Sequence, residues 1–237
     1  MSRKVLITGA NRGIGLALVK EFQSRGDQVY AGCRTPDRAE ELNALAGKSE
    51  GTVCVFRLDV TRPESVAAAS QFVWSQTDAL DILINNAGIF PEPSADVTLN
   101  ELEMRDCRDA FDTNVLGVAR VTRAMLPLLE KGAAAKVANI TSGVGSISDK
   151  TRPGYYAYGT SKAALNYFTR AIAAEMKGRG PIVVAINPGW VKTDMGGPEG
   201  QLKPSQSATG IAEVIDKLTP ADNSCWFNWD GKKHESW

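Results

Sequence analysis

The sequence predicts an α/β fold in which one doubly wound parallel sheet of about seven strands carries helices on both faces. Two observations predict it. Short apolar runs rich in Val, Ile and Leu alternate along the whole chain with longer amphipathic helical patterns. No internal repeat or low-complexity linker divides residues 1–237, which we therefore expect to form a single domain. Sheets of this kind bind ligands beyond the carboxyl ends of their strands.

Each predicted element follows from its local pattern. Val5 to Ile7 is an apolar run typical of a buried strand, and apolar residues recur with helical spacing in the segment after it. Thr61 is expected to cap the helix that Pro63 opens. The later strands are predicted at 28–32, 52–57, 81–85, 136–141, 182–187 and 225–228, and the later helices at 36–46, 63–74, 99–130, 155–176 and 205–218.

The composition argues against several classes of function. The chain has 237 residues, of which 43% are hydrophobic, and its 27 basic residues balance 27 acidic ones. A net charge of zero argues against a nucleic acid or an anionic membrane as partner. No apolar run reaches membrane-spanning length, and we expect no signal peptide. His234 is the only histidine, which argues against a histidine-ligated metal and against histidine acid–base chemistry.

The four cysteines are widely spaced along the chain and include no C-x-x-C pair. This spacing predicts neither a zinc site nor a disulfide framework. Reduced cysteines of this kind are typical of a cytoplasmic protein, and we expect that location here.

A glycine-rich turn follows the first strand, with Gly9, Gly13 and Gly15 just before the first helix. The free N–H groups of a helix N-terminus and the helix dipole favour a phosphate at such a turn. Glycine is suited to it because a side chain would keep a pyrophosphate away from the backbone. An ordinary glycine-rich turn is the alternative, because the spacing differs from G-x-G-x-x-G.

Two arginines near this turn favour NADP(H) over NAD(H). Arg34 follows the second strand, where dinucleotide-binding folds often carry an acidic residue for the adenosine ribose and Cys33 stands here instead. Arg12 lies within the glycine turn itself. Together they could hold a 2′-phosphate, although each could also be a solvated surface residue.

Chemistry-bearing residues follow the later strands. Tyr158 and Lys162 are four residues apart on a predicted helix and share a face, so the ammonium group is expected to lower the pKa of the phenol. A phenol with a lowered pKa can serve as an acid or base near neutral pH. Ser142 follows the fifth strand and could hydrogen-bond a substrate or its own backbone.

Apolar residues on the loops at these strand ends suggest an apolar pocket for aldehydes, ketones or quinones. They are Phe90, Pro91, Tyr155, Trp190 and Met195. Trp190 and Met195 belong to a long Gly- and Pro-rich segment after the sixth strand, which suits either a loop over a site or a surface connection.

Several motifs occur here in one order: Thr8-Gly9-x3-Gly13-Ile14-Gly15, Asn86-Ala87-Gly88, Asn114, Ser142, Tyr158-x3-Lys162 and Pro188-Gly189. In combination they resemble the short-chain dehydrogenase/reductase family, whose fold is of the Rossmann type, and the resemblance covers essentially the whole chain. The segment PGWVKTDMGGP and the ending with Asp230, Gly231 and Trp237 resemble its sniffer-like or C-factor-like carbonyl reductases.

The resemblance implies a catalytic set of Asn114, Ser142, Tyr158 and Lys162. Tyr158 would protonate the carbonyl oxygen, Lys162 would bind the nicotinamide ribose, and Asn114 would hold a water that continues the proton path. Ser142 would bind the substrate oxygen, with Ser146 as the alternative because Ser142 lies sixteen residues before Tyr158. The expected cofactor-binding residues are Gly9, Asn11, Arg12, Gly13, Ile14, Arg34, Asp59, Val60, Asn86, Ala87, Gly88, Tyr158, Lys162, Pro188, Gly189, Val191 and Thr193.

Two other functions compete with an NADP(H)-dependent carbonyl reductase. A nucleotide-sugar epimerase or dehydratase would need an appended substrate domain, and only 44 residues follow Thr193 (237 − 193). A cofactor-sensing or signalling protein on the same fold would usually lack the Tyr–Lys pair.

Apolar residues on two helices suggest self-association. They are Val115, Val118, Leu165 and Phe168. In the resembled family the outer faces of these helices pair across a two-fold axis, which implies a homodimer or a homotetramer. The alternative is that these residues only form the core.

Overall fold

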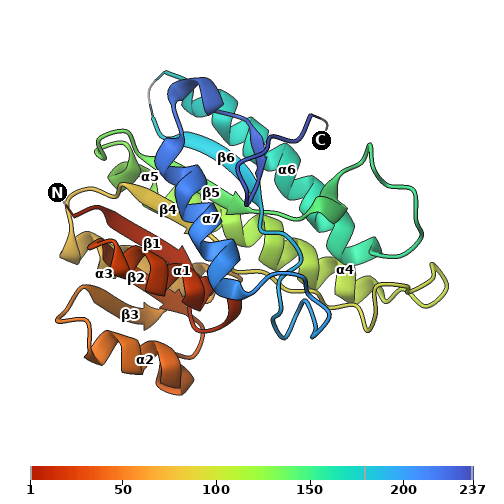
Figure 1. The fold of residues 1–237 in the computed structure, drawn as a ribbon, viewed down its shortest axis with the longest axis horizontal. Helices are drawn as coiled ribbons and strands as arrows, with labels where there is room; N and C mark the ends of the chain where they lie inside the picture. Colours follow the sequence, from red (N-terminus) through yellow and green to blue (C-terminus); the bar gives the residue numbers. More distant parts are fainter. Residues whose placement is uncertain (1, 179, 236) are drawn as a thin grey trace.

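The computed structural model describes residues 2–178, 180–235 and 237 and arranges them around one parallel sheet (Figure 1). Its seven strands are ordered β3-β2-β1-β4-β5-β6-β7, so the winding of the chain reverses between β1 and β4. The strands are β1 (Lys4–Thr8), β2 (Gln28–Cys33), β3 (Val53–Arg57), β4 (Ile82–Asn85), β5 (Lys136–Ile140), β6 (Ile182–Asn187) and β7 (Trp226–Asn228). The predicted fold class is thereby confirmed.

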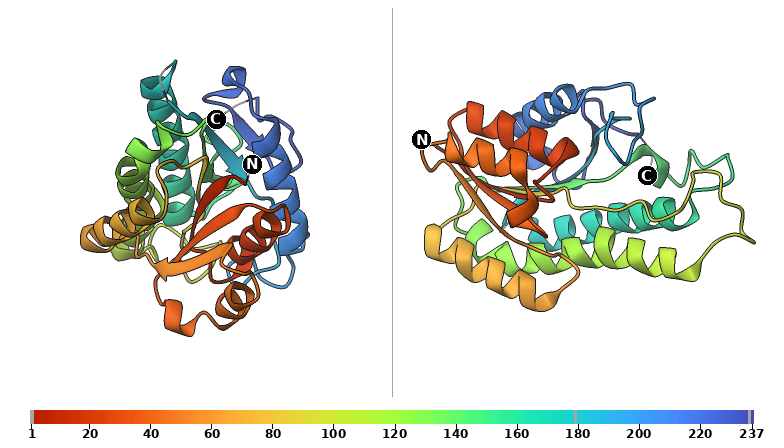
Figure 2. Two further views of the ribbon diagram at one scale, coloured as in Figure 1. Left: turned by 90° about the vertical axis from the view of Figure 1, so that its left-hand side faces the viewer. Right: turned by 90° about the horizontal axis from the view of Figure 1, so that it is seen from below.

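Helices cover both faces of the sheet (Figure 2). One face carries α1 (Gly13–Ser24), α2 (Glu40–Gly47) and α7 (Pro204–Lys217). The other carries α3 (Pro63–Gln76), α5 (Gly117–Leu129) and α6 (Tyr156–Met176), with α4 (Met104–Phe111) alongside α6. Because helices cover both faces, the strands are apolar on both sides and appear in the sequence as continuous apolar runs.

Strand β1 shows how the core forms on both sides of the sheet. Val5 and Ile7 pack into the apolar cluster beneath α1 and α7, whereas Leu6 packs into the cluster on the opposite face. Side chains alternate between the two faces of a strand, and because helices cover both faces all three side chains are fully buried. Burial of each such side chain stabilises the fold by roughly 1.5–3 kcal/mol.

The predicted helical region 99–130 is wrong in its start, which is at Met104 in the structure, and it contains a π-helical segment. A turn precedes α4, because the Glu101 carboxylate accepts hydrogen bonds from the backbone N–H and the hydroxyl of Thr98. The π-helical segment η2 (Asp112–Leu116) joins α4 to α5 without interrupting the helical backbone. Such segments are frequent at functional sites, and this one carries Asn114.

Two smaller expectations about helix starts are also wrong. Thr61 does not cap α3: the residue before that helix is Arg62, and the Thr61 hydroxyl donates to Asp59 at 2.7 Å instead. The predicted helix 36–46 is broken into the short 3-10 helix η1 (Pro36–Arg38) and α2, with Ala39 in a non-helical conformation between them.

Candidate active site

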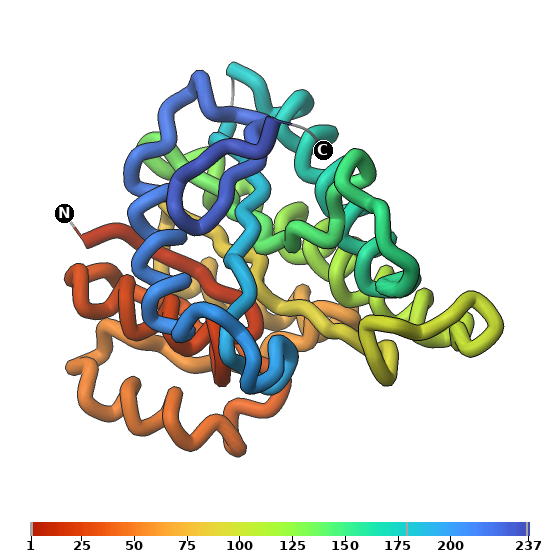
Figure 3. Tube along the Cα trace, turned by 45° about the vertical axis from the view of Figure 1, so that its right-hand side comes forward, coloured from red at the N-terminus to blue at the C-terminus, as the bar shows by residue number. Residues whose placement is uncertain are grey.

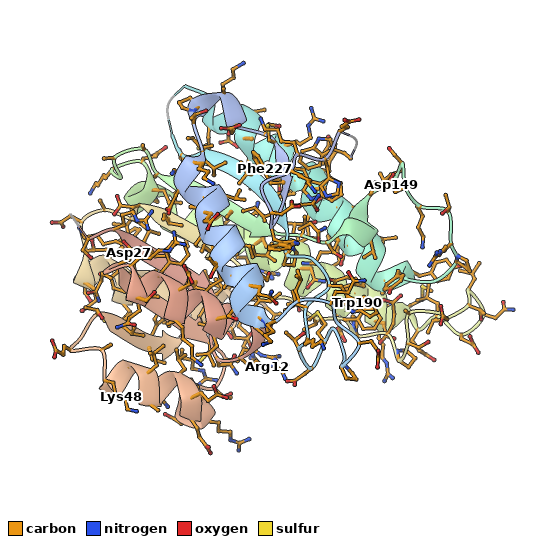
Figure 4. The ribbon with its side chains drawn as sticks, in the orientation of Figure 1. Arg12, Asp27, Lys48, Asp149, Trp190 and Phe227 are labelled. Atoms are coloured by element: carbon orange, nitrogen blue, oxygen red, sulfur yellow. The ribbon has the colours of Figure 1, made fainter. Side chains whose placement is uncertain are left out.

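A cleft of about 920 Å³ lies at the carboxyl ends of the central strands, where doubly wound sheets bind their ligands. Figure 4 shows Arg12 and Trp190 toward this end of the sheet and Asp27 at the other. Fifteen of the predicted cofactor-binding residues line the cleft: Gly9, Asn11, Arg12, Gly13, Ile14, Arg34, Asp59, Val60, Asn86, Ala87, Gly88, Tyr158, Lys162, Pro188 and Thr193. Their roles in binding stay predictions.

The glycine turn brings the backbone of α1 close to the cleft. Gly9 and Gly13 have φ angles of +65° and +54°, in the left-handed region that favours glycine. At Gly15 a Cβ atom would lie 2.1 Å from the carbonyl oxygen of Gly9, so only glycine lets the helix approach the strand this closely. Among the described residues no side chain caps α1 at its N-cap, Arg12, which leaves first-turn N–H groups available to a phosphate.

Thr8 and Asn86 tie the glycine turn to the end of β4. The Thr8 hydroxyl accepts hydrogen bonds from the backbone N–H groups of Asn86 and Ala87, at 3.0 and 2.9 Å. The Asn86 amide in return donates to the carbonyl oxygens of Thr8 and Gly9, at 2.9 and 3.2 Å. These hydrogen bonds therefore fix the loop after β1 and the loop after β4, which both border the cleft, relative to each other.

Arg34 is the exposed cation at the end of β2 that lines the cleft. Arg12 also lines it, but its guanidinium forms an ion pair with Asp194 at 2.7 Å, and both partners are exposed. Burial alone would raise the pKa of nearby Asp59. Hydrogen bonds from Thr61 and the charges of Arg34 and Arg62 lower it by a larger amount, so the net shift of the pKa is downward.

Cys33 does not occupy the place that the sequence suggested for it. Its side chain is 1% exposed and packs into the apolar cluster beneath α1. Side chains alternate along a strand, so the residue that faces the cleft at the end of β2 is Arg34. An acidic residue at position 33 would therefore be buried in the core instead of facing a ribose.

Tyr158 and Lys162 lie one turn apart on α6 and both line the cleft. The Lys162 ammonium is 5.6 Å from the centre of the Tyr158 ring and donates to the Ile140 carbonyl at 2.8 Å. Burial lowers the pKa of Lys162 to about 8. Burial also raises the pKa of Tyr158 to about 12, against the lowering by its hydrogen bond with Ser142. This direction is opposite to the one expected from the Tyr–Lys spacing.

Ser142 and Ser146, the two alternatives for the substrate hydroxyl, differ in their partners. Ser142 lies close enough to the Tyr158 phenol to act on it and lower its pKa, and the Ser142 oxygen accepts from the Val144 N–H at 3.4 Å. Ser146 is 3% exposed, and its hydroxyl donates to the Asp149 carboxylate at 2.7 Å. Of the two, Ser142 is the one engaged with Tyr158.

Asn114 is fully buried behind the cleft in η2. Its amide oxygen accepts from the Ile89 N–H at 2.9 Å, and its amide nitrogen donates to the Ile89 carbonyl and to the Ser161 hydroxyl, at 3.0 and 2.9 Å. Asn114 thus joins the loop after β4 to α6 behind Lys162. That it holds a water stays a prediction.

Two predicted cofactor residues lie apart from the cleft lining. Val191 is 3% exposed and bridges to Leu202, while Gly189 packs against Leu202 and Trp229. Sequence analysis also missed residues that do line the cleft, among them Ile89 and Thr113. Their places directly after Gly88 and before Asn114 are the only signals that could have pointed to them.

The apolar residues expected around a substrate fall into two groups. Phe90 packs against Tyr155, with ring centres 5.9 Å apart, and stands edge-on to Tyr158 at 5.3 Å. Trp190 and Met195 are about half exposed on the loop after β6. Phe90 therefore lies beside the phenol of Tyr158 with Tyr155 packed on it, whereas Met195 is the one of the five expected pocket residues found among the described residues that line the cleft.

Two features are absent from the described part of the chain. No helix there is long and apolar enough to cross a membrane. No group of three or more His, Cys, Asp and Glu side chains within 2–178, 180–235 and 237 could hold a metal ion.

A doubly wound sheet with a glycine turn at its first helix defines a dinucleotide-binding fold, and comparison with known proteins identifies the family. Residues 3–203 match the sequence profile of the family described as short chain dehydrogenase. The chain therefore belongs to the short-chain dehydrogenase/reductase family, and its relatives place it with the sniffer-like and C-factor-like proteins.

Three relatives illustrate the likeness. A carbonyl reductase from chicken fatty liver, solved with NADPH bound, is 36% identical, with a TM-score of 0.91 over 100% of this chain and 99% of that one. The carbonyl reductase Sniffer of D. melanogaster is 32% identical, with a TM-score of 0.92 over 100% of both chains. C-signal of Myxococcus xanthus is 42% identical over 65% of this chain and 92% of its own length.

Proposed function

We propose that this chain, as a single catalytic domain, reduces an aldehyde, ketone or quinone to the alcohol with NADPH, and that Tyr158 is the proton donor. The observation that carries the proposal is the pairing of Tyr158 with Lys162 in the cleft at the carboxyl ends of the strands, with Ser142 next to the Tyr158 phenol. The likeness to carbonyl reductases supports the reaction type.

The residues of the cleft have separate tasks in this reaction. When bound, NADPH would supply a hydride to the carbonyl carbon of the substrate, which would leave negative charge on the carbonyl oxygen. Tyr158 then gives its phenolic proton to that oxygen, which Ser142 orients by a hydrogen bond. A pKa of about 12 keeps Tyr158 protonated at neutral pH and therefore ready to donate. Lys162 brings a positive charge that stabilises the phenolate left behind.

The residues around the glycine turn fit a dinucleotide phosphate. The uncapped first turn of α1 offers N–H groups, and a Cβ atom at Gly15 would collide with the turn. Arg34 and Arg12 would hold the 2′-phosphate that distinguishes NADPH from NADH. Binding of the nicotinamide ribose by Lys162, and of the remaining predicted cofactor residues, belongs to the same proposal.

The flanking aromatic rings suit a substrate with an apolar body. A panel of aliphatic, aromatic and quinone carbonyls, assayed with NADPH and with NADH, tests the proposal. We expect oxidation of NADPH coupled to at least one apolar carbonyl, and slower turnover with NADH. Absence of coupled oxidation across the panel would overturn the proposal.

A signalling or cofactor-sensing protein is the second candidate, and the likeness to C-signal is the observation that favours it. Such a protein would bind NADPH without turning it over. Fluorescence titration with NADPH beside the carbonyl panel separates the two functions. Binding with turnover supports the reductase, whereas binding without turnover supports the sensor.

Exposed apolar side chains support a homodimer or a homotetramer. Phe111, Leu116 and Tyr167 are exposed on α4, η2 and α6. Val115, Val118 and Leu165, which suggested the same contact from sequence, are buried within the chain, and Phe168 is half buried. Light scattering is expected to give at least twice the 25.4 kDa of one chain, and a mass equal to one chain would contradict this. A cytoplasmic location stays a prediction.

A further inference from the structure

Helix α6 carries both Tyr158 and Lys162, yet its own sequence does not cap its first turn. The residue before the helix is Tyr155, which has the left-handed angles φ 54° and ψ 35°, and its side chain accepts no hydrogen bond from the described helix. Ser, Thr, Asp or Asn at this position would usually supply an acceptor. The first N–H groups of α6 therefore need acceptors from another part of the chain.

Glu92, on the loop after β4, supplies these acceptors. Its Oε1 atom accepts from the Ala157 N–H at 2.8 Å, and its Oε2 atom accepts from the Tyr158 N–H at 2.9 Å. The Glu92 residue is only 4% exposed, and a buried carboxylate is costly unless it is hydrogen-bonded. The positive end of the helix dipole stabilises it further. Both oxygens of one buried carboxylate thus hold the backbone at Tyr158.

The same loop meets the start of α6 at two other points. The Tyr155 N–H donates to the Ala95 carbonyl at 3.1 Å. At Gly154, which has a φ of +79°, a Cβ atom would lie 1.9 Å from that same carbonyl oxygen. Phe90 stands edge-on to the Tyr158 ring. In Figure 3 the loop after β4 (yellow to yellow-green) and the loop before α6 (green) both lie at the right of the molecule.

We infer that Glu92 is a positioning residue for the reaction: its carboxylate fixes the backbone of Tyr158, and with it the direction of the phenol, and docks the loop that carries Phe90. This inference rests on the reductase activity proposed above. Without the carboxylate the first turn of α6 frays, and the phenol then points toward the carbonyl oxygen for a smaller fraction of the time. Within the described chain no hydrogen bond joins Glu92 to the glycine turn proposed for the cofactor phosphates, so NADPH affinity changes much less than kcat.

The first test is Glu92→Gln, which keeps the size of the side chain and removes one of its two acceptors. We expect kcat to fall by roughly tenfold to a hundredfold, with a much smaller change in the dissociation constant of NADPH. Glu101→Gln is the matched control, because Glu101 is an exposed carboxylate of the same loop whose hydrogen bonds within the described residues go to Thr98. An unchanged kcat in Glu92→Gln, or a loss of NADPH affinity as large as the loss of kcat, would overturn the inference.

A double-mutant cycle separates positioning of Tyr158 from general stability. If Glu92 acts through the phenol, Glu92→Gln causes no further loss of kcat in a Tyr158→Phe background. The same fold-loss in both backgrounds would show that Glu92 acts elsewhere. If Glu92→Gln does not fold, Glu92→Asp, which keeps the charge but is one methylene shorter, replaces it in the cycle.

Amide hydrogen exchange in the unmodified protein tests the contact itself. First-turn amides of a helix normally exchange fast, so slow exchange at Ala157 and Tyr158 is expected only if Glu92 binds them. Fast exchange at both would overturn the inference. Slow exchange without turnover of any carbonyl would instead leave the contact in place and overturn the proposed function.

Discussion

Arg34 is the residue on which the proposed preference for NADPH depends most. It is exposed at the end of β2 and lines the cleft, whereas the Arg12 guanidinium is already paired with Asp194. A hydrogen bond to a charged group stabilises a complex by about 1.5–3 kcal/mol. Exposure to solvent places Arg34 at the lower end of that range. Since about 1.4 kcal/mol corresponds to tenfold, Arg34→Ala is expected to raise the KM for NADPH about tenfold.

The assay compares KM values for NADPH and NADH on the same carbonyl substrate. Arg34→Ala should leave the KM for NADH unchanged, because NADH lacks the 2′-phosphate, and Arg34→Asp should raise the KM for NADPH further by repulsion. Arg38→Ala is the matched control, because Arg38 is exposed on η1 and is not among the described residues that line the cleft. An unchanged KM for NADPH in Arg34→Ala would refute the reasoning.

Two further predictions concern the site and the turn. Lys162 has a pKa of about 8, so its ammonium group is charged below that pH. The kcat for reduction should therefore fall as the pH rises through about 8, while Tyr158, with a pKa of about 12, stays protonated. A kcat that does not change with pH in this range would contradict a role for the charge of Lys162. Gly15→Ala forces a Cβ atom against the Gly9 carbonyl and should destabilise the fold by about 1–3 kcal/mol in urea unfolding. Gly47→Ala, where nothing lies within 4 Å, should not destabilise it, and equal effects of the two changes would refute the argument.

Much of the fold could be predicted from the sequence because parallel strands are buried on both faces. Val5 to Ile7 and the run 182–187 are continuous apolar segments, and the structure has strands at both places. The π-helical segment η2 could not be predicted, because it accompanies contacts of Asn114 with Ile89 and Ser161, which are distant in sequence.

The sequence predicted which residues form the candidate site better than it predicted their pKa shifts. The spacing of Tyr158 and Lys162 places them on one face of a helix, but spacing says nothing of burial, and burial raises the pKa of Tyr158. The contact of Glu92 with α6 joins residues 65 and 66 positions apart, and no local pattern signals it. The orientation of Cys33 was also not predictable, because the sequence alone does not say which face of the sheet the last side chain of a strand points to.

Turnover of Tyr158→Phe is the most direct test of proton donation by Tyr158. The substitution keeps the ring and removes only the hydroxyl, so NADPH binding measured by fluorescence should be retained while kcat falls by about a hundredfold or more, as expected for the loss of a general acid. Tyr155→Phe is the matched control, because Tyr155 packs on the same phenylalanine, Phe90, as Tyr158 does. This variant should keep most of the turnover of the unmodified protein. Near-normal turnover of Tyr158→Phe on a good carbonyl substrate would contradict the account.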